Sequence, residues 1–363
     1  MKSVAFVVGT TAEVIKVSGV AKELSALGVK FEIWSTQQQA GELDVTLSVF
    51  FTDLSTTRLS KSSKSLAKKS HVMPWIVANI SSAFKLRSSR AESLPDAIVV
   101  QGDTLSTVIG ALAGRVLSLP VVHIEAGLRS GDWRNPFPEE INRRIVSRIA
   151  RLHLAPNFNS ANNLFEHEGI VVNTFGNTGV DALREMQQRV VGKNYENREK
   201  KTNVTVVLHR TELLSKKDVF AETISFLEEL ALEFNVTMTL DVPSSIALSE
   251  LKNTGTIKNL KNLNSVPKLN FPDFVELLTR ADFVITDSGG LQEECAILGI
   301  PCFIHREVSE RLDGIGENAE LTGMSVVKLR ELTNKWEQYK RPTRWPASSP
   351  SKISARAILG LLN

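Results

Sequence analysis

Cysteine is scarce in this sequence: Cys295 and Cys302 are the only two among 363 residues. Two thiols seven positions apart, without a neighbouring histidine or cysteine cluster, fit neither a zinc site nor the disulfide framework of a small secreted protein. We therefore expect reduced thiols, no bound metal and a cytoplasmic location.

Long apolar runs and an excess of one charge are also missing. No apolar run approaches the ~20 residues of a membrane-spanning helix, and residues 1–10 lack the long apolar segment of a signal peptide. The 43 basic and 40 acidic residues give a net charge of only +3, so bulk charge supports binding to neither nucleic acid nor a membrane surface. The chain is long enough for two domains of about 150–200 residues.

Short runs rich in valine and isoleucine alternate with longer helical patterns. Strands are expected at residues 3–8, 31–36, 96–101, 121–125, 152–155 and 171–175, and in a second series at 203–208, 236–241, 283–287 and 301–305. Helices are expected at residues 12–27, 71–88, 107–117, 139–149, 159–168, 218–233, 271–280, 291–298 and 351–362. This alternation predicts an α/β fold with two Rossmann-like, doubly wound domains.

The two series meet in the segment 176–201, where a Gly-Asn-Thr-Gly run and a short helical pattern precede a polar stretch. We predict an N-terminal domain over residues 1–175 and a C-terminal domain over residues 176–350. Residues 56–70, rich in serine and lysine, and residues 341–350, with three prolines, are expected to be loops.

One candidate site is the turn at Ser288, Gly289 and Gly290, which follows a hydrophobic strand and begins a helix. Glycines let the backbone approach a ligand, and the first N–H groups of a helix favour an anion. Glu294, about one turn into the helix, could accept both hydroxyls of a ribose. An ordinary turn with acidic residues at a helix start is an equally good interpretation of this short motif.

Carboxylates follow other expected strands. Asp103 follows residues 96–101, Glu125 ends residues 121–125, and Glu139 begins a helix after a proline-rich loop. Ligands of doubly wound sheets bind at the carboxyl ends of strands. Carboxylates gathered there would raise one another's pKa, which suits general acid–base chemistry. Any one of them alone would more often be a helix cap or a salt-bridge partner.

Two cationic or titratable side chains belong to the second series. His209 follows residues 203–208 and could donate to a phosphate or carry a proton. Arg311 lies a few residues beyond the strand at 301–305, where it could clamp a diphosphate with two hydrogen bonds. A hydrogen-bonded histidine and a surface arginine are the alternatives.

Taken together, these motifs resemble the non-hydrolysing UDP-N-acetylglucosamine 2-epimerases. The resemblance runs in order through GTTAEVIK at 9–16, QGDT at 101–104, HIEAGLRSGDWRNPFPEEINRR at 123–144, GNTGVDAL at 176–183, HRTE at 209–212, and DSGGLQEECAILGIP at 287–301. It implies two Rossmann-like domains in a GT-B-like arrangement, with the substrate in the cleft between them. The last helix, 351–363, would return to the first domain.

The resemblance also implies an activity and a set of roles. The enzyme would interconvert UDP-GlcNAc and UDP-ManNAc, or act on a modified UDP-2-acetamido sugar, as a homodimer without metal or cofactor. Asp103, Glu125, Glu139 and His209 would be catalytic. The residues implied to bind the substrate are Lys16, Arg129, Ser288, Gly289, Gly290, Glu294 and Arg311.

The sequence departs from the family at several points. Thr11 stands where the family has an arginine near the diphosphate, and losing that cation should weaken phosphate stabilisation by a few kcal/mol. Two family segments that contain a histidine read Gln37-Gln38 and, at residues 242–245, VPSS. Some bacterial members build an allosteric UDP-GlcNAc site partly from those regions, so we do not expect that regulation here.

Three other functions stay open from the sequence. A glycosyltransferase of the same architecture would need an acceptor and would transfer sugar without exchange at C2. A hydrolysing epimerase would release free ManNAc and UDP. A catalytically inactive sensor would bind UDP-GlcNAc without turnover, although such a binder has no need of acid–base carboxylates.

Overall fold

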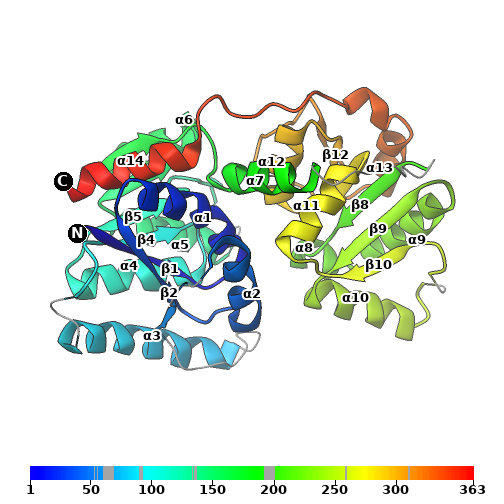
Figure 1. The fold of residues 1–363 in the computed structure, drawn as a ribbon. Coiled ribbons are helices and arrows are strands. Elements are labelled where there is room, and N and C mark those ends of the chain that lie inside the picture. Colours follow the sequence, from blue (N-terminus) through cyan, green and yellow to red (C-terminus); the bar gives the residue numbers. More distant parts are fainter. Residues whose placement is uncertain are drawn as a thin grey trace. The chain divides into compact units, whose positions relative to one another are not determined.

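A computed structural model of the chain describes residues 1–52, 54, 56–59, 69–89, 93–132, 134, 137–191, 201–257, 260–309 and 311–363. The chain forms two compact units (Figure 1). Unit 1 consists of Met1–Arg184 and Pro346–Asn363, and unit 2 of Glu185–Trp345. The domain boundaries predicted from the sequence lie after residues 175 and 350.

Unit 1 is built on a parallel sheet whose seven strands lie in the order β3-β2-β1-β4-β5-β6-β7 among the described residues. The strands are β1 (Ser3–Val8), β2 (Lys30–Ser35), β3 (Thr56–Arg58), β4 (Ala97–Gln101), β5 (Val121–Ile124), β6 (Leu152–Ala155) and β7 (Ile170–Asn173). The helices are α1 (Thr11–Ala26), α2 (Ala40–Phe50), α3 (Lys69–Ser89), α4 (Leu105–Leu117), α5 (Glu139–Ser147), α6 (Phe158–Asn162), the start of α7 (Gly179–Val191) and α14 (Pro350–Leu362).

Unit 2 repeats this plan with six described parallel strands in the order β10-β9-β8-β11-β12-β13. Its strands are β8 (Asn203–Val207), β9 (Asn235–Leu240), β10 (Asn264–Pro267), β11 (Phe283–Thr286), β12 (Cys302–Ile304) and β13 (Ala319–Leu321). Its helices are α8 (Thr211–Leu214), α9 (Lys217–Glu233), α10 (Val242–Asn253), α11 (Phe271–Arg280), α12 (Gly289–Leu298), α13 (Val326–Thr333) and the 3₁₀ turn η1 (Trp336–Tyr339).

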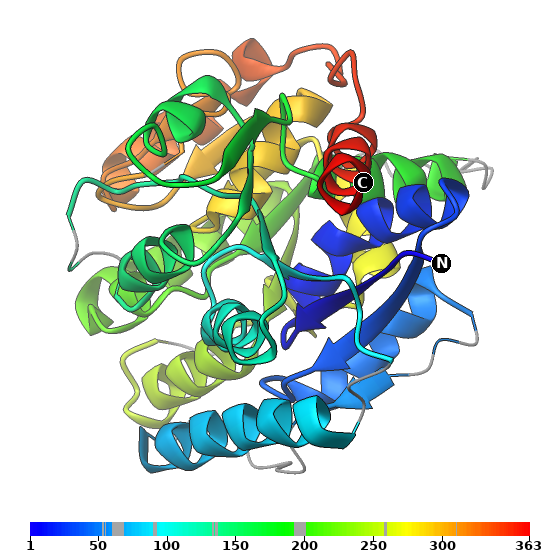
Figure 2. The same cartoon turned by 90° about the vertical axis from the view of Figure 1, so that its left-hand side faces the viewer.

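The central strands are apolar without alternation, because helices cover both faces of each sheet. In β1, residues 4–8 are completely buried, and β11 is buried along its whole length. The last helix, α14, packs along α1, as both views show (Figures 1 and 2). Its first turn is held by Asp181, whose carboxylate accepts hydrogen bonds from Ser349 Oγ at 2.9 Å and Ser351 N at 2.8 Å.

The predicted α/β class with two parallel sheets is confirmed, and all ten expected strands form. Two expectations were wrong. Residues 56–58, expected in a loop, form the edge strand β3, while residues 60–68 of that loop lie outside the described part. The helix expected at 159–168 ends at Asn162, because turns lead from there to Gly169, whose φ of +117° is incompatible with a helix.

No helix in the described ranges has both the length and the apolar composition of a membrane span.

The strand order fixes where a ligand would bind. In each sheet the order reverses between the first strand and its neighbour: between β1 and β4 in unit 1, and between β8 and β11 in unit 2. Doubly wound sheets bind ligands at the carboxyl ends of the strands beside such a switch point. The loops after these four strands are therefore the places to look for chemistry.

Candidate active site

In unit 1, the side chain of Glu125 is held at the carboxyl end of β5 by two donors. Lys16 Nζ, from α1, lies 2.5 Å from Glu125 Oε2, and the side-chain amide of Gln101, the last residue of β4, donates to the same oxygen. The glutamate side chain is only 4% exposed and the lysine 22%. A lysine and a carboxylate in contact at a sheet edge form a pair that can share or transfer a proton.

The loop after β4 is fixed by the strand beside it. Gly102 N donates to Ile124 O at 3.0 Å, and Gly102 O lies 2.8 Å from His123 Nε2. A carbonyl only accepts, so the proton is on Nε2 of this imidazole. Because burial disfavours the cation, the pKa of His123 falls to about 4, so the ring is neutral at neutral pH. Glu125 and Asp103 follow these clamped residues and are positioned together.

Asp103 is bound by an arginine that the sequence interpretation did not assign to the site. Arg143, on α5, approaches Asp103 Oδ2 with Nη2 at 2.6 Å and Nε at 2.8 Å. The arginine side chain is 8% exposed and the aspartate 27%. Asn142 Nδ2 also donates to Asp103 O at 2.8 Å. The spacing of residues 139 and 143, one helical turn apart, was the signal that could have identified Arg143.

The two adjacent glutamates at the start of α5 are in different environments. Glu140 is fully buried and accepts from Ser130 N, Arg143 Nη1 and Arg144 Nε at 3.2, 3.2 and 3.0 Å, which makes it structural. Glu139 has a buried Oε2 with no hydrogen-bond partner among the described residues. Residues 135 and 136 of the preceding loop lie outside the described part. Of the pair, Glu139 is the one available for a substrate hydroxyl or amide.

The amino end of α1 is occupied by the protein's own groups. Glu13 accepts from Gly9 N at 2.7 Å, Thr10 N at 2.8 Å and Thr104 Oγ1 at 2.6 Å, and Thr11 N donates to Gln39 Oε1 at 3.3 Å. Burial raises the pKa of Glu13, although these hydrogen bonds oppose the change. Since the N–H groups of residues 9–11 are all engaged, this helix start is not arranged to hold a phosphate.

Arg129, predicted to bind substrate, lies against α5. Its Nη2 donates to Ser147 Oγ at 3.0 Å and its Nη1 to Leu128 O at 2.8 Å. Burial lowers the pKa of this arginine, although the Glu140 carboxylate opposes that change. These contacts tie the loop after β5 to α5. A role for Arg129 in substrate binding stays a prediction.

In unit 2, Asp287 connects the two loops at the switch point. It follows β11 and is fully buried, and its carboxylate accepts from His209 N at 3.1 and 3.0 Å and from Arg210 N at 2.8 Å. Burial raises the pKa of Asp287, whereas the His209 charge and both main-chain N–H groups lower it. The sequence interpretation read this residue only as the end of a strand.

The amino end of α12 is open, unlike that of α1. The N-cap residue Ser288 makes no side-chain capping bond. Within the described ranges, no acceptor takes the N–H groups of Gly289, Gly290 or Leu291; the first intrahelical bond is from Gln292 N to Ser288 O, at 3.0 Å. Gly290 is exposed. Three N–H groups at a helix start attract an anion.

Arg311 lies beside this helix. Its Nη1 is 2.6 Å from Glu293 Oε2, and both side chains are 15% exposed. Gln292 Nε2 donates to Arg311 O at 3.1 Å and Gln292 Oε1 accepts from Ser309 Oγ at 2.9 Å, which fixes the loop against α12. Glu310 lies outside the described part. Glu294 is half-buried on α12.

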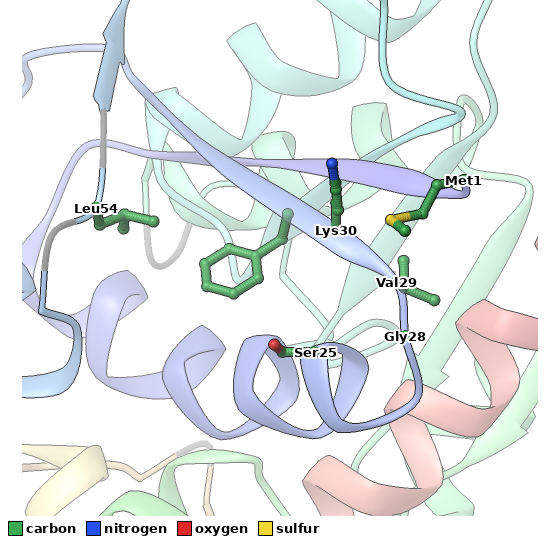
Figure 3. A pocket seen from close by; sticks show the side chains of 7 residues that line it. Met1, Ser25, Gly28, Val29, Lys30 and Leu54 are labelled. Carbon is green, nitrogen blue, oxygen red and sulfur yellow. The ribbon is translucent and has the colours of Figure 1, made fainter.

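A shallow cavity of about 410 Å³ lies elsewhere, at the amino ends of the unit 1 strands (Figure 3). Its lining includes Met1, Ser25, Lys30 and Leu54. Lys30 is the first residue of β2, at the edge of the sheet opposite the carboxylates. This cavity is therefore separate from the candidate site.

The chain is similar in sequence to known proteins over most of its length. Residues 29–346 match the family described as UDP-N-acetylglucosamine 2-epimerase. A Ralstonia solanacearum protein named probable UDP-N-acetylglucosamine 2-epimerase is 32% identical over 347 residues, which cover 91% of this chain and 89% of that protein. The UDP-N-acetylglucosamine 2-epimerase of Methanocaldococcus jannaschii is 30% identical over 355 residues, or 93% of each chain.

Solved structures have a similar fold. The Methanocaldococcus jannaschii UDP-GlcNAc 2-epimerase in complex with UDP-GlcNAc and UDP superposes with a TM-score of 0.78 at 26% identity, over 99% of each chain. The Neisseria meningitidis enzyme bound to UDP-GlcNAc superposes with a TM-score of 0.80 at 24% identity, over 100% of this chain and 99% of that one, and shows the same fold.

Proposed function

Since the chain belongs to the UDP-N-acetylglucosamine 2-epimerase family, we propose that it interconverts UDP-GlcNAc and UDP-ManNAc. A modified UDP-2-acetamido sugar is the same substrate class. The observation that carries the proposal is the contrast between the two units. Unit 1 presents carboxylates beside cations at its strand ends, and unit 2 presents an open helix start. Epimerisation of a UDP-sugar requires an anion site for the diphosphate and acid–base groups for the sugar.

The diphosphate is assigned to the start of α12. The N–H groups of Gly289, Gly290 and Leu291 point along the helix axis with the positive end of its dipole. The hydroxyl of Ser288 adds a donor, and Arg311, held beside the helix by Glu293, adds a cation. Glu294, further along α12, is proposed to accept the ribose hydroxyls.

The sugar is assigned to the unit 1 carboxylates. A base removes the proton from C2 as the C1–O bond breaks; the C–H electrons form the C1=C2 double bond, and UDP leaves with the electrons of the bond to C1. The 2-acetamidoglucal then takes a proton at C2 on the opposite face while a UDP oxygen re-forms the bond to C1. Two faces require two acid–base groups.

Unit 1 offers such groups in distinct environments. Glu125 is in contact with the Lys16 ammonium, Asp103 is held by Arg143, and Glu139 has a buried oxygen without a partner in the described residues. We propose that these three carboxylates carry the proton transfers and orient the acetamido group. His209, on a loop of unit 2, is proposed to assist the departing diphosphate.

Exchange at C2 tests this function. Purified protein incubated with UDP-GlcNAc in D₂O should place deuterium at C2 and yield UDP-ManNAc, measured by NMR. The absence of both with every UDP-2-acetamido sugar would overturn the proposal. Free ManNAc with UDP would indicate a hydrolysing enzyme, and sugar transfer to an added acceptor without exchange would indicate a glycosyltransferase.

We also propose a homodimer in the cytoplasm. On α3, the exposed residues Met73, Val77 and Phe84 are spaced to share one face of the helix, which suits a contact with a second copy. Cys295 and Cys302 are free and buried, as suits a reducing compartment. Sedimentation velocity should show a dimer in the wild type and a monomer in Val77→Glu. A monomeric wild type would contradict this assignment.

A further inference from the structure

The buried carboxylate of Asp287 has no part in the reaction as proposed above. It lies at the carboxyl end of β11, and the main-chain N–H groups that it binds belong to His209 and Arg210, just beyond β8. These two strands are neighbours at the switch point of the unit 2 sheet. The carboxylate therefore joins the loop after β11 to the loop after β8.

A carboxylate in this place is costly unless its oxygens are hydrogen-bonded. Asp287 is fully buried, and both of its oxygens accept main-chain N–H groups. That arrangement is stable only when the backbone at residues 209 and 210 turns both N–H groups towards the aspartate. The interaction selects one backbone conformation of the loop.

The imidazole of His209 depends on that conformation. Its side chain is partly exposed, and within the described residues no side-chain hydrogen bond holds it. The direction of the ring is then set by the backbone from which it projects. We propose that Asp287 is a positioning residue that fixes the main chain of His209 for its work on the substrate. The role of His209 in this proposal rests on the proposed function, whereas its positioning by Asp287 does not.

The same sheet contains a matched control. Asp282 accepts Asn203 N at 2.9 Å, so it makes the same kind of contact between the same two strands, at their amino ends. The Asp287→Asn and Asp282→Asn substitutions each leave a single acceptor oxygen for main-chain N–H groups. Only the first of them adjoins His209.

The first test is a double-mutant cycle with turnover and UDP affinity as readouts. Asp287→Asn should lower kcat by about 10²-fold, as small misplacements of a catalytic group do, whereas Asp282→Asn should not. In the His209→Asn background, adding Asp287→Asn should change kcat by less than about twofold, because coupled residues are not additive. Two outcomes would overturn the proposal: additive losses of kcat from the two substitutions, or a loss of UDP affinity from Asp287→Asn both with and without His209. Either outcome would mean that Asp287 supports the phosphate-binding turn instead.

The second test needs no turnover. Imidazole NMR signals of the six histidines, with His209 assigned from the His209→Asn spectrum, should shift for His209 in Asp287→Asn and stay in place in Asp282→Asn. An unmoved His209 signal would overturn the proposal. Asp287→Ser, with a smaller side chain and one acceptor, replaces the asparagine variant if that does not fold. If the wild type is inactive on UDP-2-acetamido sugars, the proposed function is overturned. The NMR comparison would still decide whether Asp287 positions His209.

Discussion

Lys16 and Glu125 are 109 positions apart in the sequence and in contact in the fold. The lysine comes from the second turn of α1 and the glutamate from the residue after β5. Three described strands, β2, β3 and β4, lie between α1 and β5 along the chain, whereas in the sheet only β4 lies between β1 and β5. A parallel sheet brings loops from distant segments to one edge, and there the side chains of α1 and β5 meet.

Removing the lysine charge should impair the reaction. Lys16→Ala leaves Glu125, whose side chain is 4% exposed, without its cation. We expect kcat for C2 exchange to fall by about 10²–10⁴-fold, the range for losing one acid–base group. The measurement is deuterium uptake at C2 of UDP-GlcNAc. Lys22→Ala, on the same helix over the ring of Phe50, is the control and should retain full exchange. Equal rates in both variants would exclude Lys16 from the chemistry.

The sequence could not predict which side chains of the site contact one another. Residue type and strand ends place Asp103 and Glu125 on loops and Glu139 at a helix start, since polar residues after apolar strands are visible in the sequence. Whether a carboxylate meets a cation depends on which helix packs beside it, as the Asp103–Arg143 pair shows. The role of Asp287 is long-range in the same sense, because His209 and Arg210, whose N–H groups it accepts, are 78 and 77 positions away.

At the scale of elements, the starts of α1 and α12 differ although both follow the first or fourth strand of a Rossmann-like sheet. The α1 start has a capping box, in which the side chains of Thr10 and Glu13 satisfy each other's main-chain N–H groups. The α12 start, with Gly289 and Gly290, has no such partner in the described residues. The start of α1 is closed and that of α12 is open, which supports the proposal that the anion binds to unit 2.

Gly290→Ala should separate stability from binding. A Cβ there meets nothing closer than Ser288 Oγ at 3.9 Å, so the helix accepts alanine and gains up to about 1 kcal/mol in the free energy of unfolding. The methyl group would obstruct a phosphate, and losing one hydrogen bond to a charged group costs about 1.5–3 kcal/mol. UDP affinity by calorimetry should therefore fall about tenfold or more.

The control is another open glycine in a helix. A Cβ at Gly360, on α14, meets nothing within 4 Å. Gly360→Ala should stabilise the chain similarly and leave UDP affinity unchanged. If Gly290→Ala binds UDP as tightly as the wild type, the diphosphate does not lie at α12.

Element prediction succeeded for strands and helices with strong apolar patterns and missed several others, both short and long. The strands β1 and β6 and the helix α11 have the bounds expected from their patterns. The three-residue strands β3 and β13 were missed, because each owes its pairing to a neighbouring strand rather than to its own composition. Strand β10 and helices α2, α8, α10 and α13 were also missed.

At the scale of the whole molecule, each unit contains a deeply buried neutral histidine. His123 in unit 1 and His305 in unit 2 are fully buried, and burial lowers the pKa of each to about 4. His305 lies between Thr223 Oγ1, at 3.0 Å from Nε2, and Thr322 Oγ1, at 2.8 Å from Nδ1. In the unfolded chain, histidine takes up a proton near pH 6.5.

The free energy of unfolding should therefore fall as the pH drops from about 6.5 to about 4, because only the unfolded state binds these protons over that window. Each histidine contributes a loss of about 3 kcal/mol by pH 4. Glu13 and Asp287 act in the opposite direction: burial raises their pKa, so acidification relieves the cost of their charge.

Urea unfolding at pH 7 and pH 4.5 checks this dependence. His305→Gln keeps a donor and an acceptor for the two threonines and should lose less stability between the two pH values than the wild type does. His71→Gln, a change to another histidine, should behave as the wild type. The same pH dependence in all three proteins would mean that His305 does not cause the acid sensitivity.

Unit 1 is discontinuous, since Pro346–Asn363 returns to residues of the first half after all of unit 2. During synthesis, the contiguous residues 185–345 emerge from the ribosome before the helix that completes unit 1 exists. Until α14 arrives, the face of α1 that it covers stays exposed, and this helix carries Lys16. Unit 1, which carries Lys16 and Glu125, is thus completed last, after unit 2 has had time to fold.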